Sequence, residues 1–374
     1  MRRLKVLATS ALPPLYDAWM SELLRGPIPA ESEATCDDCA MCANGPVLPG
    51  EKAFDPNTKC CTYVPALPNF LVGRILQDRD PEARAGRESV EARMLAKIAV
   101  TPLGIGVTAP KTAHLRLAAR HDGFGRTPSL RCPHYVEDGG KCGIWKSRTS
   151  TCATWFCKHV RGAVGADFWH EGVEALLRAT ELALSRWCVL QLDPGTSAIR
   201  RLFPQDPREE PDAQFEYEPD VYRCDWGTWM GKERAFFLES ARLVSKLRWA
   251  DVVKIGGIEL SARANVARTL YDALLSTEVP RALRPGPIQL PYIGPDTTRI
   301  TSYNPNDPLD LPNELVALLP RFDGRPTRKV LADIEVNDGI AIDEALVSRL
   351  VDFEILVAAD GVSPHGARKA GPLR

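Results

Sequence analysis

Cysteine is the residue type whose spacing in this sequence best suits chemistry, because nine of the eleven cysteines fall into two groups. Gaps of two residues allow successive thiolates to reach one metal centre from a single tight turn, as in zinc and iron–sulfur sites. We therefore predict that all nine bind metal, the first group being Cys36, Cys39, Cys42, Cys60 and Cys61 and the second Cys132, Cys142, Cys152 and Cys157.

The adjacent pair Cys60–Cys61 bears on the number of metal sites. Neighbouring residues in extended backbone point to opposite sides, so these two thiols are not expected to serve one ion unless a turn reorients them. One interpretation is that they belong to two sites, each completed by cysteines of the other group. Another is that one of the pair, together with Cys42, is not a ligand. The remaining cysteines, Cys188 and Cys224, are expected to be buried small apolar residues.

Three features favour an iron–sulfur centre. The first three cysteines repeat the spacing of a ferredoxin-type run, and Cys132 is followed by proline, as the remote ferredoxin cysteine often is. Trp145, Trp155 and Phe156 lie between or beside the cysteines and are expected to form a dry sheath around a cluster. Nine thiols also exceed what one structural zinc requires. We predict an iron–sulfur cluster.

Zinc is the alternative. Four-cysteine zinc sites commonly organise small, loop-rich segments with weak cores, which describes residues 31–70. His134 and His159 each follow a cysteine by two residues, and they are candidates for zinc ligands or for hydrogen-bonding partners of the ligands.

The charge pattern suits a thiolate site. Residues 84–161 are basic, with 14 Lys or Arg and 5 Asp or Glu. Residues 205–225 are acidic, with 2 Lys or Arg and 8 Asp or Glu. Cations near a site with four thiolates would stabilise its negative charge and lower the thiol pKa values. Arg148 and Lys146 lie close to Cys152 in sequence and are the nearest candidates. The alternative is that the basic and acidic segments face each other across an interface.

The second cysteine group carries a family resemblance. It runs Cys132-Pro-His-Tyr, Gly140-Lys-Cys-Gly-Ile-Trp, Arg148-Thr-Ser-Thr-Cys152 and Cys157. Together with the opening Cys36-Asp-Asp-Cys-Ala-Met-Cys, this pattern resembles the CxxCxxCC, or YkgJ-type, cysteine-cluster family over about residues 34–160. The resemblance implies a zinc- or iron-chelating domain. Related clusters occur in flagellin lysine methylases, so it also suggests modification of a protein or peptide.

Two positions depart from the family pattern. The contiguous double cysteine appears as Cys60–Cys61 after an insertion, and Thr149 stands where the family has proline. A looser turn before Cys152 is therefore expected. No methyltransferase signature is recognisable beyond residue 160, and the sequence shows no convincing acid, base or nucleophile apart from the cysteines. Whether the protein is an enzyme is left open.

The composition bounds the class of protein. The 374 residues are 44% apolar and 25% charged, which excludes a mostly disordered chain, a coiled-coil rod or a collagen-like fibre. The net charge of −1 gives no field that attracts nucleic acid or an acidic membrane. Polar residues and prolines interrupt the apolar run that a secretory signal would need near the N-terminus. No stretch of the sequence is apolar for long enough to span a membrane. We predict a soluble, cytoplasmic protein, whose reducing surroundings favour metal binding over disulfides.

The elements that position the cysteines follow from hydrophobic periodicity. The first helix is expected to end near Gly26. Further helices are expected over 88–99, from an N-cap at Asp167, over 231–249 and over 259–276. In the C-terminal part we expect helices at 313–319, from Thr327 to Glu335 and from Asp343 to Asp352, and then a strand at 353–358.

The predicted fold class is α+β, mainly α. The domains expected are a cysteine-cluster metal-binding domain (1–165), with little regular structure over about 31–165, a helical region (166–280), a Pro-rich linker (281–311), a winged-helix-like module (312–360) and a flexible tail (361–374). The module lacks a dense basic helix, so we expect it to bind a protein or peptide partner rather than DNA.

Two other motifs receive a structural interpretation. Gly104-Ile-Gly-Val-Thr-Ala109 fits a dinucleotide-binding glycine pattern, but flanking prolines interrupt the strand and helix that this motif requires. Trp226 and Trp229 flank a turn and are expected to pack in a core or interface rather than on a ligand.

Overall fold

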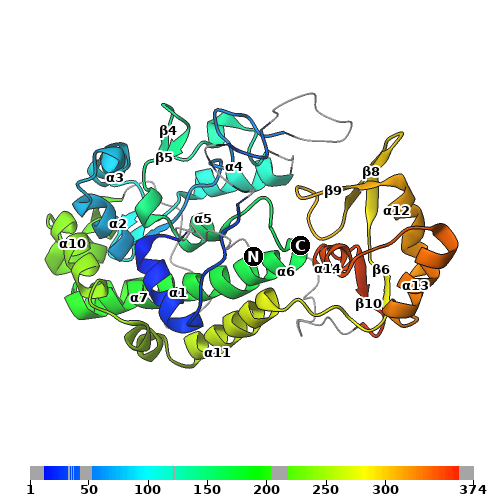
Figure 1. The fold of residues 1–374 in the computed structure, drawn as a ribbon. Helices are drawn as coiled ribbons and strands as arrows, with labels where there is room; N and C mark the ends of the chain where they lie inside the picture. The colour runs from blue at the N-terminus through cyan, green and yellow to red at the C-terminus, as the bar shows by residue number, and fades with distance from the viewer. Residues whose placement is uncertain are drawn as a thin grey trace.

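The structure is a computed structural model that describes residues 12–32, 34, 36, 38–42, 53–120, 123–203 and 218–361. The described part is mainly helical with short antiparallel strands, which agrees with the predicted class (Figure 1). None of its helices is long and apolar enough to cross a membrane.

The cysteine-containing part is built on short elements. In chain order these are α1 (Pro14–Leu24), β1 (Leu67–Pro68), α2 (Asn69–Gln77), η1 (Pro81–Ala83), α3 (Arg84–Leu95), β2 (Val100–Thr101), β3 (Gly104–Ile105), α4 (Ala109–Arg120), η2 (Pro128–Leu130), β4 (Tyr135–Val136), β5 (Lys141–Cys142), η3 (Trp145–Ser147) and α5 (Ser150–Thr154). The expectation of little regular structure over 31–165 is therefore wrong for α2–α4. It remains apt for the cysteines themselves, which lie mostly in turns.

The middle of the chain is helical. It contains α6 (Gly162–Asp167), the π-helical segment η4 (Phe168–Glu174), α7 (Ala175–Leu192), α8 (Thr196–Leu202), α9 (Pro219–Trp226), η5 (Gly227–Trp229), α10 (Glu233–Val244) and α11 (Trp249–Leu275). Helix α9 lies at the end of the acidic segment 205–225, of which residues 205–217 lie outside the described residues.

Three of the predicted helices need correction. Asp167 is not an N-cap, because its backbone is already helical (φ −60°, ψ −44°) and the chain is helical from Gly162 onward. The helix expected over 88–99 instead runs from Arg84 to Leu95, and Leu95 is 87% exposed. Helix α11 begins at Trp249 rather than 259. It is kinked at Gly257 (φ 64°), close to the predicted start.

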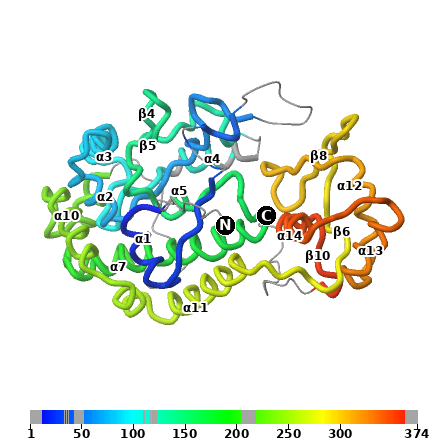
Figure 2. Tube along the Cα trace, viewed as in Figure 1, coloured from blue at the N-terminus to red at the C-terminus, as the bar shows by residue number. Residues whose placement is uncertain are grey.

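The C-terminal lobe contains β6 (Leu283–Pro285), β7 (Gln289–Ile293), β8 (Thr297–Thr301), β9 (Leu309–Pro312), α12 (Asn313–Leu318), η6 (Leu319–Arg321), α13 (Thr327–Asp338), α14 (Glu344–Asp352) and β10 (Leu356–Ala358). Strands β7, β8 and β9 form one antiparallel sheet, and β10 pairs with β6. Figure 2 shows this lobe beyond the end of α11.

The expected linker over 281–311 is not a linker, because it supplies β6–β8 and most of β9. Its prolines misled the prediction. Pro291 lies in β7, an edge strand of the sheet, where a missing N–H is tolerated, and Pro312, the residue after the segment, ends the other edge strand β9. The three predicted C-terminal helices are present, and the Asp343 side chain caps α14 by accepting a hydrogen bond from the Leu346 N–H. Residues 362–374 of the expected tail lie outside the described residues.

Buried apolar side chains form three clusters. The largest packs α1 against η4, α7 and α11, and it includes Trp19, Trp169 and Tyr271. The second lies around α2 and α10, and Trp226 is fully buried in it, as expected of a core residue. The third cluster consists only of C-terminal residues from Leu283 to Leu356. The C-terminal lobe thus has a core of its own.

Candidate metal centre

Arg148 lies near four of the clustered cysteines. Its side chain is buried, and its guanidinium carbon stacks 3.4 Å from the centroid of the Trp145 ring. Its Nη1 donates a hydrogen bond of 3.3 Å to the Cys152 carbonyl oxygen. Burial lowers the pKa of Arg148. The negative charges of four nearby thiolates raise it, and these belong to Cys142, Cys36, Cys152 and Cys60. These four come from both sequence groups, so the fold draws the two groups together around one cation.

Lys59 holds three of the cysteine-bearing segments together. Its Nζ donates hydrogen bonds to the Cys36 carbonyl at 2.5 Å and to the Gly140 carbonyl at 3.2 Å. In the same region, the Cys132 N–H donates a 2.7 Å hydrogen bond to the Cys61 carbonyl. These hydrogen bonds to backbone carbonyls fix the spacing of the segments without using the thiols, which remain available for a ligand.

A close approach of two glycines positions Cys142. Strand β5 pairs with β4, which sets Cys142 opposite Tyr135. The following residue, Gly143, lies against Gly86 in α3, where a Cβ on Gly86 would be 2.0 Å from the Gly143 carbonyl oxygen. Only glycine permits such an approach. Helix α3 therefore contributes to the site through a residue that the sequence analysis did not single out.

Glu181 anchors the helix that carries Cys152. Its Oε1 accepts the Ser150 N–H at 2.6 Å and its Oε2 accepts the Ser150 hydroxyl at 2.8 Å, at the first residue of α5. The Tyr16 hydroxyl donates to the same carboxylate. Burial raises the pKa of Glu181 to about 7, although these hydrogen bonds act in the opposite direction. A buried carboxyl on α7 thus links α1 to the cysteine helix.

Other thiols of the cluster also influence one another. The thiols of Cys39 and Cys42 are hydrogen-bonded to each other. Burial is the largest cause that raises the pKa of Cys157, to about 12. The negative charge of Cys39 is the second cause and that of Cys60 the third. Cys39 therefore lies near enough to influence both Cys42 and Cys157, and Cys60 influences both Cys157 and Arg148.

Most thiols of the cluster favour the protonated form. Burial raises the pKa of Cys36 to about 11 and those of Cys132 and Cys152 to about 12. Cys60 is the exception, because a hydrogen bond from the Cys61 thiol lowers its pKa to about 7. A bound metal ion would favour the thiolate over the protonated thiol, because the thiolate is the form that coordinates metal.

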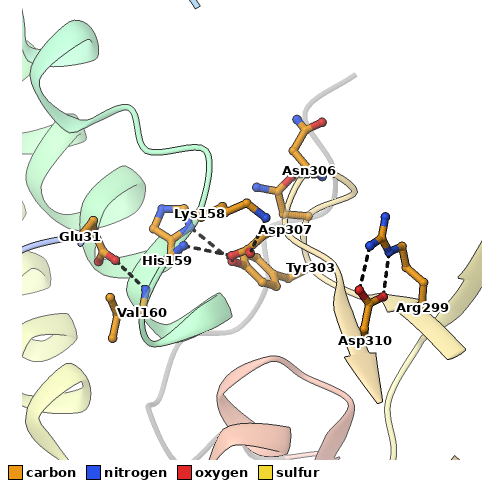
Figure 3. Close-up of polar contacts among 10 residues, drawn as sticks. Glu31, Lys158, His159, Val160, Arg299, Tyr303, Asn306, Asp307 and Asp310 are labelled. Atoms are coloured by element: carbon orange, nitrogen blue, oxygen red, sulfur yellow. Dashed lines mark hydrogen bonds and ion pairs between the residues drawn. The ribbon is translucent and has the colours of Figure 1, made fainter. Parts of the chain in front are cut away.

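His134 and His159 each have one ring nitrogen near a hydroxyl group and one without a hydrogen-bonding partner among the described residues. His134 Nδ1 lies 2.7 Å from the Ser89 hydroxyl, which itself donates to the Gly86 carbonyl. His159 Nδ1 lies 3.3 Å from the Tyr303 hydroxyl (Figure 3). The Nε2 atom of each ring is buried and has no hydrogen-bonding partner among the described residues. Burial lowers the pKa of both imidazoles to about 4. The neutral imidazole is the form of histidine that binds transition metals.

The thiols do not yet have the geometry of a loaded site. Within the described residues, no three His, Cys, Asp or Glu side chains converge as a bound metal requires. The pairs Cys60–Cys61 and Cys39–Cys42 hydrogen-bond to each other instead. All eleven cysteines are described, and none forms a disulfide. Metal binding would therefore require loss of thiol protons and rotation of side chains.

The predictions for the other side chains had mixed outcomes. Cys188 is fully buried, as expected, but Cys224 is exposed on α9, so its assignment as a buried apolar residue is wrong. In the expected aromatic sheath, Phe156 is buried, whereas Trp145 and Trp155 are 47% and 40% exposed. Trp145 instead covers one face of Arg148.

A cavity of about 820 Å³ lies on the other side of Glu181. Its walls come from β1, β3 and α7, with Leu103, Ile105 and Leu182 among the apolar lining residues. Arg178 also lines the cavity. Because Glu181 binds Ser150 at the start of α5, one side chain connects this cavity with the helix that carries Cys152.

Comparison with protein-family models, with curated proteins and with solved structures gives no match for this chain.

Proposed function

We propose that this protein binds metal through its clustered cysteines and holds an iron–sulfur centre. The observation that carries this proposal is the gathering of thiols from four separate segments around the buried cation of Arg148. Cysteines that served only as apolar side chains would have no reason to surround a charged guanidinium. An anionic thiolate–metal centre would neutralise that cation, and the resemblance to the YkgJ-type family is consistent with this proposal.

In this proposal the cavity beside Glu181 accommodates a substrate, which makes the protein a redox or peptide-modifying enzyme. Its volume of about 820 Å³ is in the range of small-molecule sites. An iron–sulfur centre would supply electron transfer. The chain's own contributions would be the largely apolar lining, which would contact the substrate, and Glu181, which fixes the cysteine helix against α7. The winged-helix-like interpretation of residues 312–360 adds a docking surface for a protein or peptide.

The alternative function is a zinc-stapled interaction or assembly protein. The structural feature that favours it is the position of the cysteines in turns joined by backbone hydrogen bonds, which is typical of zinc-organised loops. Closed tetrahedral sites would serve folding alone and would leave the cavity without a catalytic role.

Absorption and electron paramagnetic resonance spectra of anaerobically purified protein separate the two functions. The iron–sulfur proposal predicts a brown protein with broad charge-transfer absorption that bleaches on reduction with dithionite, and a paramagnetic signal in one oxidation state. The Cys142→Ser variant should lose both signals, whereas Cys224→Ser, which changes an exposed thiol outside the cluster, should retain them. A colourless protein containing stoichiometric zinc would establish the alternative.

A further inference from the structure

The apolar lining of the cavity beside Glu181 is aliphatic. It comes from β1, β3, α7 and α8 and from the residues between β2 and β3, and no aromatic side chain is among the described residues that line the cavity. Leu182 of α7 belongs to this lining and is 51% exposed. Covering that leucine with a ligand would be favourable, because apolar surface would leave water. With no ring available for stacking, the lining suits a flexible hydrocarbon chain rather than a flat aromatic molecule.

Four of the charged side chains in the lining form two neutral pairs. Arg201 Nε lies 2.6 Å from Asp225 Oδ1, which joins α8 to α9. Arg263 Nη2 lies 3.1 Å from Glu259 Oε1, within α11. In each pair the carboxylate offsets the charge of the guanidinium, so neither pair attracts a charged ligand strongly. Glu181 also lines the cavity, and burial raises its pKa to about 7, which disfavours a negative charge there.

Arg178 of α7 is the remaining arginine of the lining, and it is exposed. Its charge acts on Glu174 and Glu181, one turn to either side, but within the described residues no hydrogen bond or ion pair joins it to either. Both carboxylates accept hydrogen bonds from α5 instead. The Arg178 guanidinium is therefore available to a ligand, and its planar array of N–H groups matches a carboxylate. One available cation matches one negative charge, which favours a carboxylate over a phosphate dianion.

We propose that this cavity binds a long-chain carboxylate, whose hydrocarbon chain lies along the aliphatic lining and whose head binds Arg178. This inference rests on the proposed function only in taking the cavity as the substrate site, and it adds the chemical class of that substrate. The cavity, of about 820 Å³, has the usual form of a small-molecule site, mostly apolar with a few polar groups that orient the ligand. Binding itself requires no metal, so it can be measured whatever the cysteines hold.

Calorimetric titration of the full chain with sodium decanoate tests this proposal. We expect one bound molecule per chain. Decan-1-ol, which has the same hydrocarbon chain without the charge, should bind at least roughly 10-fold more weakly, because it cannot form the charge-assisted hydrogen bonds to Arg178. Each CH₂ group removed from the carboxylate should weaken binding by up to roughly 4-fold.

Two pairs of variants separate the charge from the chain. Arg178→Met should bind decanoate at least roughly 10-fold more weakly and leave the affinity for decan-1-ol unchanged. Its control is Arg186→Met, at an exposed arginine of α7 that does not line the cavity. Leu182→Asp should weaken the binding of both ligands. Leu190→Asp, at a leucine of α7 that is 53% exposed and lies outside the lining, should weaken neither.

The absence of decanoate binding would overturn this inference, as would binding that both Arg178→Met and Leu182→Asp leave unchanged. Equal affinities for decanoate and decan-1-ol would overturn the assignment of a carboxylate. Metal content is measured on the same preparations. A chain that carries metal and binds no decanoate would refute this inference and leave metal binding intact, whereas a chain that binds decanoate and carries no metal would refute the metal centre alone.

Discussion

The backbone of Gly86 in α3 lies against that of Gly143, so that a Cβ on Gly86 would be 2.0 Å from the Gly143 carbonyl oxygen. Because Gly143 directly follows Cys142, this contact sets the distance between α3 and one of the candidate ligands. It gives the cluster a wall of regular structure on one side, although the cysteines themselves lie largely in turns.

Gly86→Ala should disturb the site without changing any thiol. Overpacking against a backbone carbonyl cannot be relieved by rotating a side chain, so we expect a loss of about 1–3 kcal/mol in the free energy of unfolding, together with reduced metal content. Gly106→Ala is the control, because its nearest neighbour, Ala99, would be 3.8 Å from the new Cβ. Denaturant unfolding and metal analysis of the two variants check this prediction. Equal behaviour of both would contradict the positioning role of Gly86.

Arg148→Met should weaken the metal-loaded protein selectively. With thiols protonated, a buried guanidinium stabilises little, whereas with thiolates it neutralises charge. We expect metal affinity to fall by at least roughly 10-fold, while the metal-free chain keeps or gains thermal stability. Lys146→Met, at an exposed lysine two residues away, should change neither. Thermal unfolding with and without metal is the measurement, and an equal loss in both states would oppose the prediction.

Glu181 should make stability depend on pH. Burial raises its pKa from 4.5 to about 7 in the folded protein. Between pH 4.5 and pH 7, the native state therefore keeps a proton that the unfolded state has lost. The free energy of unfolding should therefore fall as pH rises from about 4.5 to 7, by up to about 3 kcal/mol from this residue. Its full stabilising contribution is present below pH 4.5.

Glu181→Gln removes this titration and retains an oxygen for Ser150 and Tyr16. Urea unfolding at pH 5 and pH 8 should show a smaller decrease with pH for this variant than for the unmodified chain. Glu171→Gln, at an exposed glutamate in η4, should leave the pH dependence unchanged. The same slope in all three proteins would show that Glu181 is ionised throughout this range.

The thiols should separate into two classes on substitution. Cys152→Ser is expected to lose metal and solubility together, because ligand binding and folding are coupled. Cys188→Ser should lose about 1–3 kcal/mol of stability with metal content intact, since the Cys188 thiol is fully buried away from the cluster. Metal analysis of purified variants tests this division. Loss of metal from Cys188→Ser, with retention in Cys152→Ser, would mean that the thiols are assigned the wrong way round.

The sequence predicted what depends on local pattern. The cap at Asp343, the burial of Cys188 and the helix after Gly257 all follow from periodicity or from short-range chemistry. The position of Arg148 near the cysteines could also be predicted from the sequence, because it lies four residues before Cys152.

What the sequence did not reveal depends on contacts between distant segments. Nothing near Gly86 indicates that Gly143 will lie against it, and nothing near His159 points to Tyr303, 144 residues further along the chain. The strands within 281–311 were missed because prolines weaken the strand pattern and are tolerated only through the edge positions that the tertiary fold provides.

The inorganic content of the protein tests the iron–sulfur proposal most directly. The anaerobically purified 374-residue chain should contain iron and acid-labile sulfide in fixed ratio to the polypeptide, and both should be absent from Cys152→Ser and Cys142→Ser. Stoichiometric zinc without sulfide would contradict the iron–sulfur assignment. A folded chain with neither iron nor zinc would contradict the claim that these nine cysteines form a metal site.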